Sequence, residues 1–295
     1  MKDAEYFAHP ALGSTSIKTM ATGTPRSYWA KHVDPERTPF VPTEAMKQGS
    51  LVDCLITCPD TFDERYLLMP IDAPKRPTSA QLNAKKPAEA TIEAIQWWHD
   101  FAAELGEREV LGQEWLTNAL RIVDVLNADA TIGPILAMER ASQQAHFWTD
   151  AEHGIEVKYK SDCETEDGSL LDLKKGASAA PRWFSKQAYQ LAYDLQLAHY
   201  GLGYADLHGK PPTRYGFIVY QWAWPHECSL LVADEDYIAM GHDRRNEALE
   251  LIAKCEAEDH WPSHGESTIT PPTYANIAAA DNDTDLDDLE LEGLE

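Results

Sequence analysis

The segment from residue 155 to residue 200 constrains this chain more than any other stretch. Apolar residues alternate with Glu and Lys over residues 155–160, which is the pattern of a half-buried strand. Residues 164–168 then form a polar turn containing an Asp-Gly pair, and residues 169–174 have the composition of a returning strand. The sequence therefore predicts a β-hairpin here, and a helix is predicted to follow it.

Two acids and a lysine occupy this hairpin in a pattern typical of metal-assisted phosphodiester cleavage. Asp172 and Lys174 are two residues apart on one strand, so their side chains leave the same face, and Asp162 can converge on that face from the preceding strand. Mg²⁺ prefers oxygen ligands, and a bound metal activates water and neutralises charge on a phosphate. A nearby ammonium stabilises the negative transition state. We therefore expect a site for Mg²⁺ or Mn²⁺ with Lys174 as a catalytic residue.

The Asp-x-Lys triplet alone has little specificity, and a second acid-x-lysine triplet lies at Glu156–Lys158. Such triplets are more often solvated strand edges than sites. We favour the copy at Asp172 because an acid precedes it at strand spacing and a polar stripe follows it on a helix predicted over residues 181–202. That stripe falls at positions i, i+4, i+7 and i+11 and consists of Tyr189, Tyr193, Gln196 and Tyr200. A glutamine among aromatic residues points to the predicted site.

Length, charge and cysteine content limit the remaining possibilities. The chain has 295 residues, enough for one large domain or two small ones, and its net charge of −24 argues against a protein that simply coats DNA. A nuclease stays possible, because metal ligands are themselves acidic. The five cysteines are not spaced for an iron–sulfur cluster. Without an apolar run of membrane length or a signal peptide, we expect a cytoplasmic protein with no membrane contact.

The order of predicted elements indicates an α/β fold with a central mixed sheet flanked by helices and an N-terminal helical elaboration. Helices are predicted over residues 43–58, 88–105, 113–126 and 234–259, and further strands over 143–149, 214–222 and 227–232. We expect one domain over residues 1–265, with a helical part (1–138), a core (139–265) and an acidic tail (266–295) too polar to fold alone.

Two stretches lean basic in this acidic chain. Residues 11–33 contain Ser16, Lys18 and Arg26, which either contact phosphates or belong to ordinary surface helices. Residues 70–88 are rich in proline and lysine, and there DNA contact and a mere connection are equally good interpretations. The sequence leaves both alternatives open.

Several motifs give the chain a resemblance to a known group of enzymes. They are STSIKTM…TPRSYWA, TEAMKQGSLVDCLITCPDTFDERY, HFWTDAEHGIEVKYKSDC, LLDLKK and YQLAYDLQLAHY. Over about Leu12–Glu258 the chain resembles the PD-(D/E)xK nuclease superfamily, and more closely the phage and prophage exonucleases of the RecE (exonuclease VIII) type. The resemblance implies a restriction-endonuclease-like core.

The resemblance also implies roles for individual residues. Asp162 and Asp172 match the metal-binding acids, and Lys174 matches the catalytic lysine. Gln196 and Tyr200 match polar and aromatic positions on the helix after the active-site strands, which makes Gln196 a catalytic candidate and Tyr200 a candidate for DNA contact.

Two positions depart from the RecE pattern. Asp53 stands where that pattern has a metal-contacting histidine, so it becomes a third candidate metal ligand. A carboxylate still suits Mg²⁺ or Mn²⁺, and the change implies either an altered metal preference or a degenerate site. Lys175 stands where Thr or Ser is common, which we interpret as tolerable.

Enzymes of this type digest one strand of linear duplex DNA from the 5′ end during phage recombination. They act as trimeric or tetrameric rings, and they leave a 3′ overhang for a single-strand annealing partner. The resemblance therefore implies an exonuclease on double-stranded DNA ends and a homo-oligomer. Two alternatives remain: a catalytically silent module that binds partners or mimics DNA, and an endonuclease of the same superfamily. Leucines within the acidic tail either dock on an annealing or single-strand-binding protein or merely belong to a solubilising segment.

Overall fold

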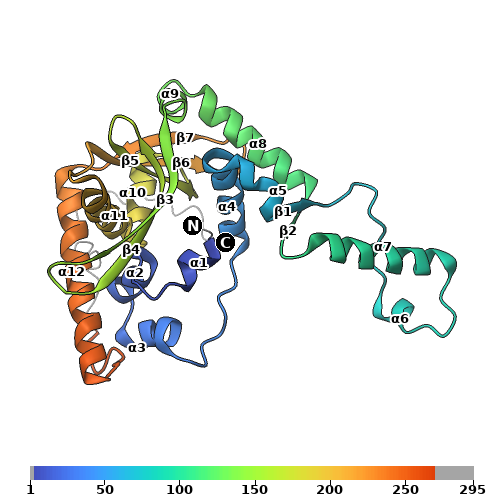
Figure 1. Ribbon diagram of the computed structural model, residues 1–295, viewed down its shortest axis with the longest axis horizontal. Helices are drawn as coiled ribbons and strands as arrows, with labels where there is room; N and C mark the ends of the chain where they lie inside the picture. Colours follow the sequence, from blue (N-terminus) through green and yellow to red (C-terminus); the bar gives the residue numbers. More distant parts are fainter. Residues whose placement is uncertain (1–2, 270–295) are drawn as a thin grey trace, which may run out of the picture.

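A five-stranded mixed sheet forms the centre of the computed structural model, which describes residues 3–269 (Figure 1). The strand order is β3-β4-β5-β6-β7, with β5 and β6 parallel and the other neighbours antiparallel. The bounds are β3 (Arg140–Thr149), β4 (Glu156–Thr165), β5 (Ser169–Gly176), β6 (Arg214–Gln221) and β7 (Cys228–Val232). The predicted mixed sheet flanked by helices is therefore confirmed.

The hairpin of β4 and β5 is joined for a short distance and then splits. Within the described chain the two strands pair at Cys163 with Leu171 and at Glu164 with Leu170. Beyond these two pairs, a side chain replaces the backbone hydrogen bonds between the strands: Asp162 Oδ2 accepts the backbone N–H of Leu173 at 2.9 Å. The split leaves room between the strands for side chains to meet.

Helices cover both faces of the sheet (Figure 1). The alternation along β6 defines the faces: Ile218 and Tyr220 pack with α4, α8 and α9, whereas Phe217 and Val219 pack with α10 and α11. The first group comprises α4 (Glu44–Thr57), α8 (Gln113–Ala128) and α9 (Ile132–Leu136). The second comprises α10 (Pro181–Gln190) and α11 (Tyr193–His208), on which α12 (Glu235–Glu258) and α2 (Ser14–Thr22) pack in turn.

The remaining elements are short or peripheral. They are α1 (Asp3–Ala8), α3 (Pro25–Tyr28), the π-helix η1 (Trp29–Val33), the 3₁₀-helix η2 (Pro59–Thr61), α5 (Phe62–Arg65), β1 (Tyr66–Leu68), α6 (Ser79–Leu82), α7 (Glu89–Leu105) and β2 (Glu109–Leu111). Strands β1 and β2 form a separate two-stranded parallel sheet.

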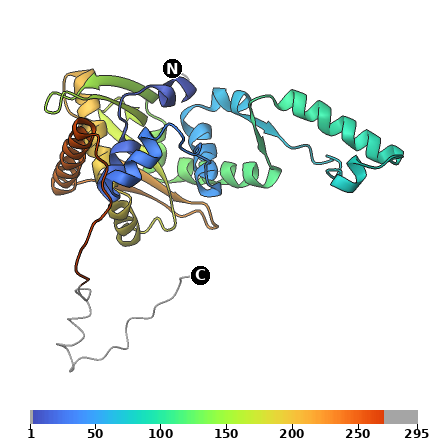
Figure 2. The same ribbon diagram turned by 90° about the horizontal axis from the view of Figure 1, so that it is seen from below.

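Residues 69–108, between β1 and β2, form an arm that projects from the body in both views (Figures 1 and 2). Its loop folds back on α7, because Trp98 Nε1 donates to the carbonyl of Pro74 at 3.1 Å and the guanidinium of Arg76 lies 4.6 Å from the Trp98 ring. Its base is tied to α4 by an ion pair between Lys47 and Glu109.

The single helix predicted over residues 181–202 is wrong. Ala192 adopts a left-handed conformation, with φ of 51°, and ends one helix before the next begins. Tyr189 therefore lies on α10, and Tyr193 and Gln196 lie on α11. Ala192 is fully buried in a cluster with residues of α2 and α12, so tertiary packing sets the break, which periodicity along the sequence cannot reveal.

The second acid-x-lysine triplet serves the structure. Lys158 Nζ donates to the carbonyls of Tyr6 and His9 at 2.6 and 2.7 Å and lies 4.7 Å from the Tyr6 ring. The Lys158 ammonium therefore fastens the N-terminal segment to β4.

A buried polar network joins α12, α11 and the sheet. Arg245, 1% exposed, forms an ion pair with Asp150 and donates from Nε to His199 Nδ1 at 3.1 Å. His199 Nε2 lies 2.9 Å from the Lys158 carbonyl. Burial and the Arg245 charge lower the pKa of His199 to about 3, so its ring stays neutral, accepts at Nδ1 and donates at Nε2.

Nearly all of the predicted acidic tail lies outside the described residues, since residues 270–295 are not among them. In the part that is described, no helix combines the length and the apolar character needed to cross a membrane.

We predict opposite effects for alanine at two helical glycines. A Cβ on Gly241 of α12 would lie 2.2 Å from the Asp194 carbonyl of α11, whereas a Cβ on Gly49 of α4 meets nothing within 4 Å. Gly241→Ala should lower the free energy of unfolding by about 1–3 kcal/mol through overpacking. Gly49→Ala should be neutral or stabilise by up to about 1 kcal/mol through helix propensity. Urea denaturation checks both, and equal stability of the two variants would contradict the packing described.

Candidate active site

Three acids from three elements meet at the split between β4 and β5. Asp162 comes from β4, Asp172 from β5 and Asp53 from α4. Asp172 is only 2% exposed, while Asp53 and Asp162 are half-buried. Gln143 of β3 joins two of them: its Nε2 lies 3.2 Å from Asp53 Oδ2 and 3.4 Å from Asp162 Oδ1. These residues form the acid cluster.

Lys174 supplies the positive charge of the acid cluster. Its ammonium forms an ion pair with Asp172 Oδ2 and lies 4.9 Å from the Tyr193 ring. Burial alone would lower the pKa of Lys174, but the Asp172 carboxylate, with Tyr193 and Asp162, reverses the sign and raises it above its usual value. Lys174 is therefore held as an ammonium, with 16% of its side chain exposed.

Gln196 of α11 fixes the other oxygen of Asp172. Its Nε2 donates to Asp172 Oδ1 at 2.8 Å, and its Oε1 accepts from Lys18 Nζ of α2 at 2.8 Å. The carboxylate and the ammonium on either side decide which way the amide points. Burial and the nearby Lys174 lower the pKa of Lys18 to about 7, against the opposing effect of Asp172.

Mutual repulsion and burial disfavour three negative charges in so small a space. Burial, Asp172 and Asp53 raise the pKa of Asp162 well above its usual range. Burial, Cys58 and Asp172 raise the pKa of Asp53 to about 7. A cation bound among the carboxylates would relieve both effects.

The donor set fits a hard divalent cation. All three acids offer carboxylate oxygens, the ligands that Mg²⁺ and Mn²⁺ prefer. Over residues 3–269, no three or more His, Cys, Asp or Glu side chains are already gathered as a metal site. Lys174 pairs with one oxygen of Asp172, and the Leu173 N–H donates to one oxygen of Asp162.

The structure separates the residues predicted to contact DNA. Lys18 joins the acid cluster, and half-buried Tyr200 lies beside it with its ring 5.6 Å from that of Tyr159. Ser16 Oγ donates to the Gly13 carbonyl within its own turn of helix. Arg26 is exposed and lies 4.6 Å from the Trp29 ring.

Two residues of the cluster were missed at the level of sequence. Gln143 has φ of 54°, and nothing in a strand pattern marks a glutamine that bridges two acids. Periodicity puts Tyr193 in the stripe of the predicted helix without giving it a role, yet its ring lies beside both Lys174 and Lys18. Lys175 points the other way and donates to Gln48 Oε1 at 2.7 Å.

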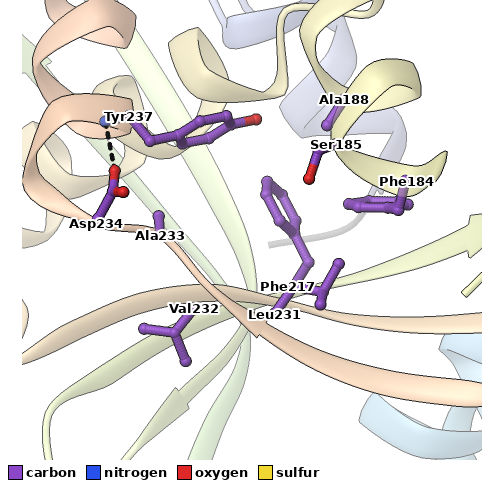
Figure 3. Close-up of a pocket in the computed structure, with 9 residues that line it drawn as sticks. All are labelled: Phe184, Ser185, Ala188, Phe217, Leu231, Val232, Ala233, Asp234 and Tyr237. Atoms are coloured by element: carbon purple, nitrogen blue, oxygen red, sulfur yellow. Dashed lines mark hydrogen bonds between the residues drawn. The ribbon is translucent and has the colours of Figure 1, made fainter. Parts of the chain in front are cut away.

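A separate pocket lies at the junction of α10, β6, β7 and the start of α12 (Figure 3). Its lining is largely apolar, and its carboxylate, Asp234, accepts the backbone N–H of Tyr237 at 2.8 Å. None of the acid cluster lines it, so the chemistry of the cluster and this pocket are distinct.

Comparison with known proteins places this arrangement in a family. Residues 13–269 match the PDDEXK-like domain of unknown function, DUF3799. The chain belongs to this family. The predicted PD-(D/E)xK membership is thereby confirmed, whereas the closer RecE-type specificity stays a prediction.

A solved structure shares the fold of this PDDEXK-like chain. It is a crystal structure of a protein from Eubacterium rectale named "Putative exonuclease", with a TM-score of 0.60 and 13% sequence identity. The match covers 95% of this chain and 98% of the other, so the arm and the core both lie within the matched length. No curated protein matches the chain.

We predict that Asp53→Asn changes the pH dependence of stability in metal-free protein. The folded-state pKa of about 7 lies above the ordinary value of 3.8, so Asp53 should destabilise the fold progressively as pH rises from about 4 to 7. The variant should match wild type near pH 4 and exceed it by about 1–3 kcal/mol at pH 8, after allowance for partial exposure. Thermal melts with a chelator present measure this, and parallel pH profiles would contradict the burial of a charged Asp53.

Proposed function

We propose that this PDDEXK-like protein is a divalent-metal-dependent deoxyribonuclease. The observation that carries the proposal is the meeting of Asp162, Asp172 and the Lys174 ammonium at the split of one hairpin, with part of the cluster open to solvent. Membership of the PDDEXK-like family supports it. The name of the Eubacterium rectale protein supports an exonuclease in particular.

Each residue has a role that follows from its contacts. Asp162, Asp172 and Asp53 would hold the cation, and Mg²⁺ or Mn²⁺ would there activate water and offset phosphate charge. Lys174, kept protonated by Asp172, orients the attacking water and stabilises charge that develops on the phosphate. Gln196 positions Asp172 through the 2.8 Å hydrogen bond to Oδ1.

The proposed substrate is linear double-stranded DNA, degraded from its 5′ end. The RecE-type motifs support this polarity, a trimeric or tetrameric ring, and cooperation with a single-strand annealing or single-strand-binding protein in phage-type recombination. They also support a cytoplasmic location in a bacterial or phage-infected cell.

A second candidate is a catalytically silent module that binds a partner or mimics DNA. The net charge of −24 and the carboxylate at Asp53, in place of the histidine of RecE-type enzymes, favour it. An endonuclease of the same superfamily is the third. Digestion of end-labelled linear DNA beside a closed circle separates the three, because an exonuclease spares the circle, an endonuclease cuts it, and a silent module leaves both intact.

Lys174→Ala should abolish cleavage of linear DNA in this assay. Loss of the ammonium removes electrostatic stabilisation of the transition state and should lower the rate at least about 100-fold. Lys175→Ala is the matched control, since that neighbouring lysine faces Gln48 and should keep nearly full activity. Equal activity of the two variants would refute the assignment of Lys174.

Metal binding should be measurable without DNA. Mn²⁺ at about 100 times its dissociation constant should stabilise wild type by about 2.7 kcal/mol, which raises the melting midpoint by several degrees. Asp162→Asn should lose most of this shift because it removes a charged ligand. A shift that is the same in both proteins would place the metal elsewhere. A normal shift without cleavage of any DNA form would favour the silent module.

A further inference from the structure

One segment of the arm concentrates positive charge, although residues 69–108 as a whole contain six acids and five bases. Between residues 73 and 88 the chain has four bases and no acid: Lys75, Arg76, Lys85 and Lys86. All four are exposed. In a protein with 49 acids and 25 bases, a segment of this kind is unusual for its surroundings. We call residues 73–88 the arm tip.

The cations of the arm tip are available to a ligand. Within residues 3–269, Lys75, Lys85 and Lys86 make no ion pair, side-chain hydrogen bond or ring contact. Arg76 covers the Trp98 ring, and Trp97 stacks on Phe101 at 5.1 Å. One face of each of these two tryptophan rings is thus covered, whereas the three lysine ammonium groups are free. Such a surface suits the phosphates of a nucleic acid better than its bases.

The arm is anchored next to the acid cluster. Its base strands contribute Tyr66 and Leu111 to the apolar core that contains Leu51 of α4, and Lys47 of α4 pairs with Glu109. Helix α4 also carries Asp53. The arm therefore extends from two strands that pack on the helix supplying one of the acids, and its tip lies well away from the body (Figures 1 and 2).

We propose that the arm tip binds the phosphate backbone of a DNA duplex whose end lies at the acid cluster. This inference rests on the proposed nuclease function and adds a second point of contact to it. The 17 residues of α7 span about 25 Å at 1.5 Å each, the rise of about seven base pairs. The contact is with the backbone, so it is independent of sequence.

The spacing favours a duplex over a single strand. DNA has a persistence length of about 150 base pairs, so a duplex held at the cluster continues straight over the reach of the arm. A flexible single strand gains little from a second contact at such a distance. A duplex held at both points would be kept in line with the cluster as it shortens, and the arm would lower its rate of dissociation.

Charge reversal at the tip tests the proposal in the full-length protein. Lys85→Glu/Lys86→Glu is compared with Lys210→Glu/Lys254→Glu, which changes the net charge equally at exposed lysines of the body. Binding is measured with a chelator present, on one-ended DNA hairpins of about 6 and about 30 base pairs, over a range of salt concentrations. Circular dichroism confirms that both variants fold.

We expect the tip variant to bind the long hairpin about tenfold more weakly at low salt, with a slope of log affinity against log salt smaller by about 2. Its binding to the short hairpin and all binding by the body variant should equal wild type. Equal effects of the two variants would show a general effect of net charge and overturn the proposal. So would unchanged binding by the tip variant, or a change in sedimentation in place of DNA affinity, which would assign the tip to a protein contact.

The binding measurement tests the arm contact separately from the nuclease activity. If wild type cuts linear DNA and the tip variant binds long duplexes normally, the nuclease stands and the arm contact fails. If wild type binds duplexes through the tip but cuts none with metal present, the arm contact stands and the nuclease fails.

Discussion

The confinement of three carboxylates beside the Lys174 ammonium governs the site. Asp162 and Asp172 come within reach of each other because β4 and β5 separate after two paired positions, and α4 adds Asp53. Such a group is unfavourable in a folded protein, as the raised pKa of Asp162 shows. It persists because Lys174 and the amides of Gln143 and Gln196 hold the carboxylates in place. The fold thus maintains an arrangement that a divalent cation would stabilise.

A chain of hydrogen bonds and an ion pair holds Asp172 rigidly in place. Asp172 has both oxygens engaged, one by Lys174 and the other by Gln196, and Gln196 is itself fixed by Lys18. Four side chains from β5, α11 and α2 therefore form one chain of contacts across one face of the sheet. Helix α11 is anchored in turn by the buried network of Arg245 and His199. Precise placement of reacting groups is what catalysis by positioning requires.

The features of the site that depend on local sequence could be predicted, and those that depend on tertiary contacts could not. Alternation and an Asp-Gly turn locate the hairpin, and two-residue spacing puts Asp172 and Lys174 on one face. The break at Ala192 and the bridging role of Gln143 could not be found, because both depend on tertiary contacts. The two acid-x-lysine triplets are alike in the sequence. What separates them is the neighbourhood of each ammonium in space.

The lysine of the unused triplet has a consequence for shortened forms of the chain. Lys158 is 6% exposed, and the Tyr6 and His9 carbonyls accept its ammonium hydrogens. A product beginning after the first ten residues would leave that ammonium without those acceptors inside the protein, at a cost that a surface deletion would not carry. The opening residues are therefore an integral part of β4's environment, and tags or protease sites are better placed ahead of them than within them.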